Sequence, residues 1–179
     1  MKKIAAPLTL ALGATILLAG CASYEGVEPS VFAKSSCGVM GDLYALEEDS
    51  VVLLENLSEI SDESITALTD QGTRTIEALT AAKTTVGQNQ PAVKEGADIT
   101  GYFNTYFDER IAAAEAAATV FEKASATEDI NEFSDAAFNF LTGISDSEEF
   151  TFPFELIKNQ KVVDAIDDEA TCKDIVAVS

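Results

Sequence analysis

Residues 97–124, ADITGYFNTYFDERIAAAEAAATVFEKA, decide the fold class of this chain. Apolar side chains recur in this stretch every three or four residues, a period that places them on one face of an α-helix. The alanine-rich run at 112–118 has a high intrinsic helix propensity, and its small side chains let a neighbouring helix approach closely. The stretch therefore predicts a long amphipathic helix that packs against other helices. Its apolar face consists of Ile99, Phe103, Tyr106, Phe107, Ile111, Ala114, Ala118 and Phe121.

Other parts of the chain show the same helical period. Alternation with period two does not extend beyond a few residues, and the Asn-Gly and Asp-Gly pairs typical of β-hairpins are absent from the sequence. Short connections favour antiparallel neighbours. The sequence therefore predicts an all-α protein, an antiparallel up-and-down helical bundle of four to five helices. The further helices are expected at 38–60, 61–87, 127–143 and 154–166.

The first 21 residues have the form of a bacterial secretion signal. Lys2 and Lys3 precede an uncharged apolar stretch at 4–18, which is shorter than the roughly 20 residues of a membrane-spanning helix. This stretch ends in the sequence Leu18-Ala19-Gly20-Cys21. The segment resembles the signal peptides of bacterial lipoproteins, whose lipobox combines a leucine, two small residues and an obligatory cysteine.

The resemblance implies that residues 1–20 are cleaved and that Cys21 becomes the first residue, carrying diacylglycerol and fatty acyl chains such as palmitate. Two or more acyl chains hold a protein firmly on a membrane. We therefore expect an extracytoplasmic protein anchored at Cys21 to the outer face of the cell membrane, or to the outer membrane if the source is Gram-negative. The alternative is an ordinary signal peptide in which Cys21 is coincidental. Residues 21–36 are expected to form the lipidated cysteine and a flexible tether, and residues 37–179 the helical-bundle domain.

The composition excludes several classes of function. The 179 residues include 31 acidic and 11 basic side chains, a net charge of -20, and no histidine. Without histidine there is no Ser-His-Asp or Cys-His catalysis and no imidazole ligand for a metal. The excess of negative charge argues against nucleic-acid binding, which depends on clustered Lys and Arg. We expect neither a metal site nor a cofactor.

Two cysteines remain beyond the leader, Cys37 and Cys172. Outside the cytoplasm an even number of cysteines favours a disulfide, so we predict that these two are bonded and tie the ends of the bundle together. Two free thiols or a bridge between molecules are the alternatives. Cys37 lies at the start of the first expected helix, and after four up-and-down helices the chain is back at that end. A fifth full-length helix would carry Cys172 away from Cys37, so either residues 145–153 cross the bundle or the fifth helix is short and oblique.

Two groups of aromatic residues are candidates for contact with a partner or ligand. Phe150, Phe152 and Phe154 flank Pro153, which favours an extended connector; they form either an exposed patch or a lid that closes one end of the bundle. Tyr102 and Tyr106 lie on the long helix, where they belong either to the core or to a cavity for an apolar ligand.

These observations predict a protein without catalytic residues that acts by binding. We expect a lipid-anchored interaction, scaffold or accessory protein of the cell envelope, with the membrane and an envelope protein as its partners. A carrier that binds a lipid or another apolar ligand between its helices is the alternative. A hydrolase using paired carboxylates is a weaker alternative, because the acidic clusters lie at expected helix ends, where capping explains them. These clusters are at 47–49, 128–129, 146–149 and 167–169.

Overall fold

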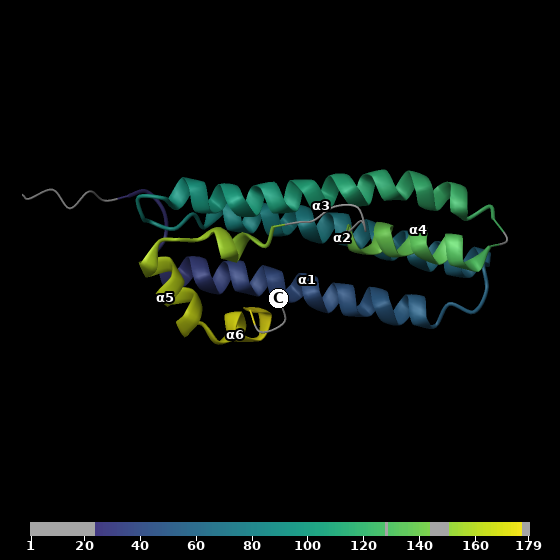
Figure 1. Cartoon of the computed structure of the whole chain (residues 1–179), viewed down its shortest axis with the longest axis horizontal. Helices are drawn as coiled ribbons and strands as arrows, with labels where there is room; N and C mark the ends of the chain where they lie inside the picture. Colours follow the sequence, from purple (N-terminus) through teal and green to yellow (C-terminus); the bar gives the residue numbers. More distant parts are fainter. Residues whose placement is uncertain (1–23, 128, 144–150, 177–179) are drawn as a thin grey trace, which may run out of the picture.

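The computed structural model describes residues 24–127, 129–143 and 151–176, and most of these residues are helical (Figure 1). The prediction of an all-α helical bundle is confirmed, since the only β-type pairing in these ranges is one isolated bridge between Val27 and Pro91. No helix in the same ranges combines the length and the apolar composition needed to span a membrane. The elements are α1 (Pro29–Glu55), α2 (Asp62–Gln88), α3 (Gly96–Ala124), α4 (Ile130–Thr142), the 3-10 helix η1 (Pro153–Leu156), α5 (Gln160–Asp168) and α6 (Ala170–Val176).

Three long helices set the shape of the bundle. Helices α1, α2 and α3 run up and down along its length, and the much shorter α4 packs against all three in one half of the bundle (Figure 1). In the other half, η1 packs on α3 and α5 packs on α1. We call the end with the α1–α2 and α3–α4 connections the distal end, and the end with the start of α1, the α2–α3 connection and α5 the proximal end (Figure 1).

Short polar signals fix where several helices begin and end. The Ser61 hydroxyl accepts a hydrogen bond from the Ser64 amide at 3.2 Å, and the Ser64 hydroxyl accepts one from the Ser61 amide at 2.9 Å, which forms a capping box before α2. Asp129 caps α4 by accepting from the Asn131 amide at 2.9 Å. Gly143 ends α4 in the left-handed conformation, with φ of 61°. The predicted extents of α2, α3 and α4 are therefore correct to within a few residues.

The start of α1 differs from the prediction. This helix begins at Pro29, and the side chains of Phe32 and Ala33 are completely buried. Just before the helix, the backbone of Val27 pairs with the α2–α3 connection. The prediction of a flexible tether extending to residue 36 is therefore wrong. Proline is well tolerated in the first turn of a helix, and this turn continues the buried face of α1.

The predicted single helix at 154–166 is also wrong. The structure has η1 and then the nine-residue α5, because Ile157 adopts an extended conformation that buries its side chain. Asn159 then starts α5 by accepting a hydrogen bond from the Lys161 amide at 3.2 Å. A short fifth helix, here α5, is one of the two arrangements expected from a bond between Cys37 and Cys172.

The disulfide between Cys37 and Cys172 is confirmed. It joins α1 to α6, the first and last helices, with a Cα–Cα distance of 5.1 Å across 135 residues of sequence. Both cysteines are buried. The bond therefore holds the short α6 against the proximal half of α1.

The buried apolar residues form two clusters along the bundle. The proximal cluster joins α1, α2 and α3 to α5 and α6, and Phe32, Phe103 and Phe107 are its largest fully buried members. The distal cluster joins α2 and α3 to α4 around Phe121, Phe133 and Phe140. Arg110 of α3 is buried where α4 ends, between the two clusters.

Candidate functional site

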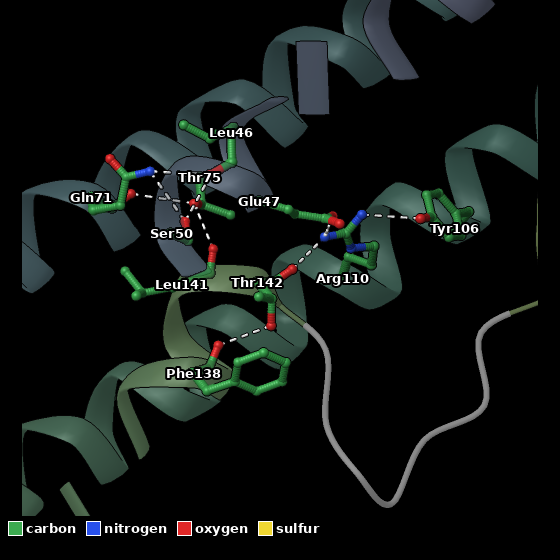
Figure 2. A network of polar contacts seen from close by, with 10 residues as sticks. All are labelled: Leu46, Glu47, Ser50, Gln71, Thr75, Tyr106, Arg110, Phe138, Leu141 and Thr142. Carbon is green, nitrogen blue, oxygen red and sulfur yellow. Dashed lines mark hydrogen bonds and ion pairs between the residues drawn. The ribbon is translucent and has the colours of Figure 1, made fainter. Parts of the chain in front are cut away.

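Arg110 is the centre of a buried polar network (Figure 2). Its guanidinium donates hydrogen bonds to the carboxylate of Glu47 on α1 and to the backbone carbonyl of Thr142 at the end of α4. It also donates to the hydroxyl of Tyr106, one turn earlier on α3, at 3.0 Å. The side chain of Arg110 is 2% exposed and that of Glu47 is 20% exposed, so the ion pair is largely shielded from water. The network thus connects three helices at one level.

The network supplies hydrogen-bond donors to the carboxyl end of α4. A helix leaves its last carbonyl groups without partners inside the helix, and a cation placed there is favourable. Arg110 supplies that cation to Thr142, and the Thr75 hydroxyl of α2 donates to the Leu141 carbonyl at 2.7 Å. A side chain added at Gly143 would lie 2.6 Å from the backbone oxygen of Arg110. The α4 terminus is therefore held closely against α2 and α3.

A second group of polar contacts connects α1 and α2 beside this terminus (Figure 2). The Gln71 side-chain amide donates to the Ser50 hydroxyl at 3.1 Å and to the Leu46 carbonyl at 3.3 Å. The Ser50 hydroxyl in turn donates to the Leu46 carbonyl at 2.8 Å. Arg74 donates to the Gln71 side-chain oxygen at 2.8 Å. Most of these groups satisfy one another, which is typical of a buried network that fixes helix register.

The ionisation of the central groups fits this role. Burial raises the pKa of Tyr106, and the neighbouring Arg110 only partly opposes that shift. Burial lowers the pKa of Arg110, but the acidic neighbours Tyr106 and Glu47 outweigh it, so the net shift is upward. Burial also raises the pKa of Tyr44, assisted by Tyr106 and Glu47. Arg110 therefore stays charged and Tyr106 stays neutral across the physiological range of pH.

The raised pKa of Tyr106 predicts an alkaline loss of stability. Above the ordinary tyrosine pKa of about 10, the unfolded state ionises first and binds fewer protons than the native state, so the free energy of unfolding falls as pH rises. Tyr106→Phe removes this contribution, and its free energy of unfolding in urea should fall less steeply between pH 9 and pH 11 (roughly one unit either side of that pKa). Equal slopes in the two proteins would contradict the assignment.

The predicted aromatic contacts lie in the proximal cluster. Phe154 meets Phe103 edge to face at a centroid distance of 5.0 Å, and Phe152 meets Tyr106 at 6.3 Å. Tyr102 is half-buried against the same cluster. Phe152 and Phe154 are therefore half-buried against the side of α3, and they neither form a fully exposed patch nor close an end of the bundle. Phe150 and Cys21 lie outside the described residues.

The acidic clusters do not share one role. Glu47 pairs with Arg110, whereas its neighbours Glu48 and Asp49 are exposed. Asp129 caps α4. Within the described ranges, no group of three or more acidic or cysteine side chains is placed to hold a metal ion. Glu128 and the cluster at 146–149 fall outside those ranges.

The sequence reasoning missed the network itself. Arg110 interrupts the apolar face of α3, one turn after Tyr106 and one turn before Ala114. The charge of Arg110 on an otherwise apolar helix face was the sequence feature that could have indicated a buried polar network. Its partner Glu47 could not be chosen from sequence, because many carboxylates are present.

Comparison of the chain with protein-family models, with curated protein sequences and with solved structures gives no significant match. The chain's own sequence and structure therefore carry the functional argument.

Proposed function

We propose that the protein is a lipid-anchored, extracytoplasmic helical bundle that serves as a non-catalytic interaction or accessory subunit of the cell envelope. The observation that carries this proposal is the apolar leader ending in Leu18-Ala19-Gly20-Cys21. The Cys37–Cys172 disulfide supports it, because such bonds persist in oxidising compartments.

The described polar groups support a binding role rather than catalysis. The Nη1 and Nη2 groups of Arg110 are bonded to Tyr106, to Glu47 and to the end of α4, so these donors serve the fold. The carrier alternative has less support, because Phe103 and Phe107 are completely buried and pack against neighbouring rings.

The bundle has a direction relative to the proposed anchor. Val27, six residues after Cys21, pairs with Pro91 in the α2–α3 connection and therefore lies at the proximal end. The 27 residues of α1 then extend over about 40 Å to the distal end. In this arrangement the distal end is presented away from the membrane, where an envelope protein can reach it.

Substitution Cys21→Ala tests the anchor. We expect the variant to incorporate no radiolabelled palmitate and to leave the membrane fraction, because the thiol that accepts the lipid is gone. Cys37→Ala is the matched control and should still be labelled, since its sulfur belongs to the disulfide. Palmitate incorporated into Cys21→Ala would refute the proposal.

Crosslinking in native membranes tests the binding role. Pull-down of the wild-type protein after crosslinking should recover one envelope protein in constant proportion to the bait. Recovery of lipid without protein would favour the carrier instead.

A further inference from the structure

The distal end carries an open hollow between its two connections. The hollow has a volume of about 520 Å³ and lies between residues 58–65 on one side and Ser125, Ala126, Thr127 and Ile130 on the other. Ile60, Ile65 and Ile130 contribute apolar surface, and the first two also pack against the distal cluster. Ile130 is 36% exposed although it is a large apolar residue. Glu59 and Asp62 stand exposed at its edge. We call this hollow the distal groove.

A second, smaller hollow adjoins the distal groove on the other side of the α1–α2 connection. It has a volume of about 210 Å³ and shares Ser58, Glu59 and Ser61 with the first. Leu53 and Leu57 add apolar surface, and Glu63 adds another carboxylate. The two hollows together place apolar and acidic side chains next to each other at the distal end, among several serine side chains.

The charges around the groove are almost all negative. Between Lys34 and Arg74 the charged residues of the sequence are all acidic, and between Arg110 and Lys158 the only basic residue is Lys123. Both segments include the distal connections. Lys34 and Lys83 lie in the proximal halves of α1 and α2, and Lys94 lies in the α2–α3 connection. Lys158, Lys161 and Lys173 lie in or next to α5 and α6. The asymmetry therefore distinguishes the groove from the proximal surface.

We propose that the distal groove binds a basic, amphipathic segment of another envelope protein. Apolar side chains of that segment would contact the isoleucines, and its Lys or Arg side chains would face Glu59 and Asp62. A second copy of this chain is disfavoured, because two acidic rims would repel each other, and so is an anionic membrane. This inference rests on the proposed function, since it names the kind of partner that an interaction protein would bind.

The test uses the purified, lipidated protein in a non-ionic detergent and a synthetic helical peptide of leucine and lysine, about five turns long. The peptide carries a benzophenone group, so that photocrosslinks can be mapped by mass spectrometry. Its affinity is measured by fluorescence anisotropy, with binding to empty micelles subtracted. We expect crosslinks at 58–65, at 125–127 and at Ile130. A peptide of the same composition, scrambled to remove its apolar face, should not give them.

Paired substitutions separate specific binding from general attraction to an acidic protein. Glu59→Lys with Ile130→Ser should weaken binding about tenfold. Asp168→Lys with Leu156→Ser likewise replaces one carboxylate by lysine and one exposed apolar side chain by serine, but at the proximal half. Leu156 is 37% exposed, close to the 36% of Ile130. This control should alter the affinity by no more than about twofold.

Several results would overturn the inference. These are equal weakening by both pairs of substitutions, crosslinks scattered over the bundle, and equal binding of the scrambled peptide. A dimer at high concentration that Ile130→Ser dissociates would show that a second copy occupies the groove. If Cys21 is acylated and a partner is recovered but the peptide does not bind the groove, only this inference is rejected. If Cys21 is not acylated, the proposed anchor is rejected, whatever the groove binds.

Discussion

Replacement of Arg110 by Met is expected to lower the free energy of unfolding by about 3 kcal/mol, the range seen when one partner of a buried ion pair is removed. Methionine fills a similar volume but donates no hydrogen bond. The Thr142 carbonyl loses its charged donor, and the partly buried Glu47 loses its counter-ion. The loss of stability should be measured by urea denaturation followed by circular dichroism.

The exposed ion pair between Lys83 and Asp108 provides a matched control. Their side chains are 38% and 56% exposed, and exposed pairs contribute about 0 to 1 kcal/mol. Lys83→Met should therefore change the free energy of unfolding by less than about 1 kcal/mol. Adding Glu47→Gln to Arg110→Met should recover part of the loss, because the unpaired charge is then removed. Similar effects of Arg110→Met and Lys83→Met would show that the buried network contributes little.

The extents of α2, α3 and α4 could be predicted because local signals define them. Ser61, Asp129 and Gly143 each act within one turn of a helix end, through a side-chain oxygen or through a left-handed backbone. The apolar period of α3 continues to its last turn. In these segments the local preference for a helix agrees with the tertiary packing, so capping residues and apolar periodicity were sufficient to predict the helix limits.

The errors occurred where tertiary contacts select between two local possibilities. Gly26 and Pro29 are typical of a loop, yet Pro29 also fits the first turn of a helix, and burial of Phe32 favours that choice. Around Asn159 the apolar period continues across a break in the helix. Ile157 reaches the core from an extended conformation, which the period cannot reveal.

The candidate site shows a similar division. The placement of Tyr106 in the core was among the alternatives drawn from the sequence, whereas the packing of Phe152 and Phe154 against the side of α3 was not. The pairing of Arg110 with Glu47 spans 63 residues and depends on how α1 and α3 align across the bundle. Helical periodicity assigns a face to each residue but does not fix the axial alignment of two helices.

Loss of the disulfide is expected to have the largest effect on the wild-type fold. A closed loop of 135 residues corresponds to about 5 kcal/mol of stability in the chain-entropy model. Cys37→Ala with Cys172→Ala should lower the free energy of unfolding by about this amount. Helix α6 has seven residues, too few to be stable alone, so its amide protons should lose protection from hydrogen exchange before those of α2 and α3.

Reduction of the wild-type protein separates loss of the bond from loss of the sulfur atoms. The protein in dithiothreitol should have about the same free energy of unfolding as the double variant. The reason is that replacing the two sulfur atoms leaves only small cavities at these buried positions, so loss of the bond accounts for most of the effect. Chain produced in a reducing cytoplasm should resemble the double variant, and exported chain should yield a peptide pair that contains both Cys37 and Cys172 when digested without reductant. Exported protein with free thiols at both positions, or a double variant as stable as the wild type, would contradict the assignment. Either result would also remove the main structural support for an oxidising location, because the argument for that location beyond the leader rests on this bond.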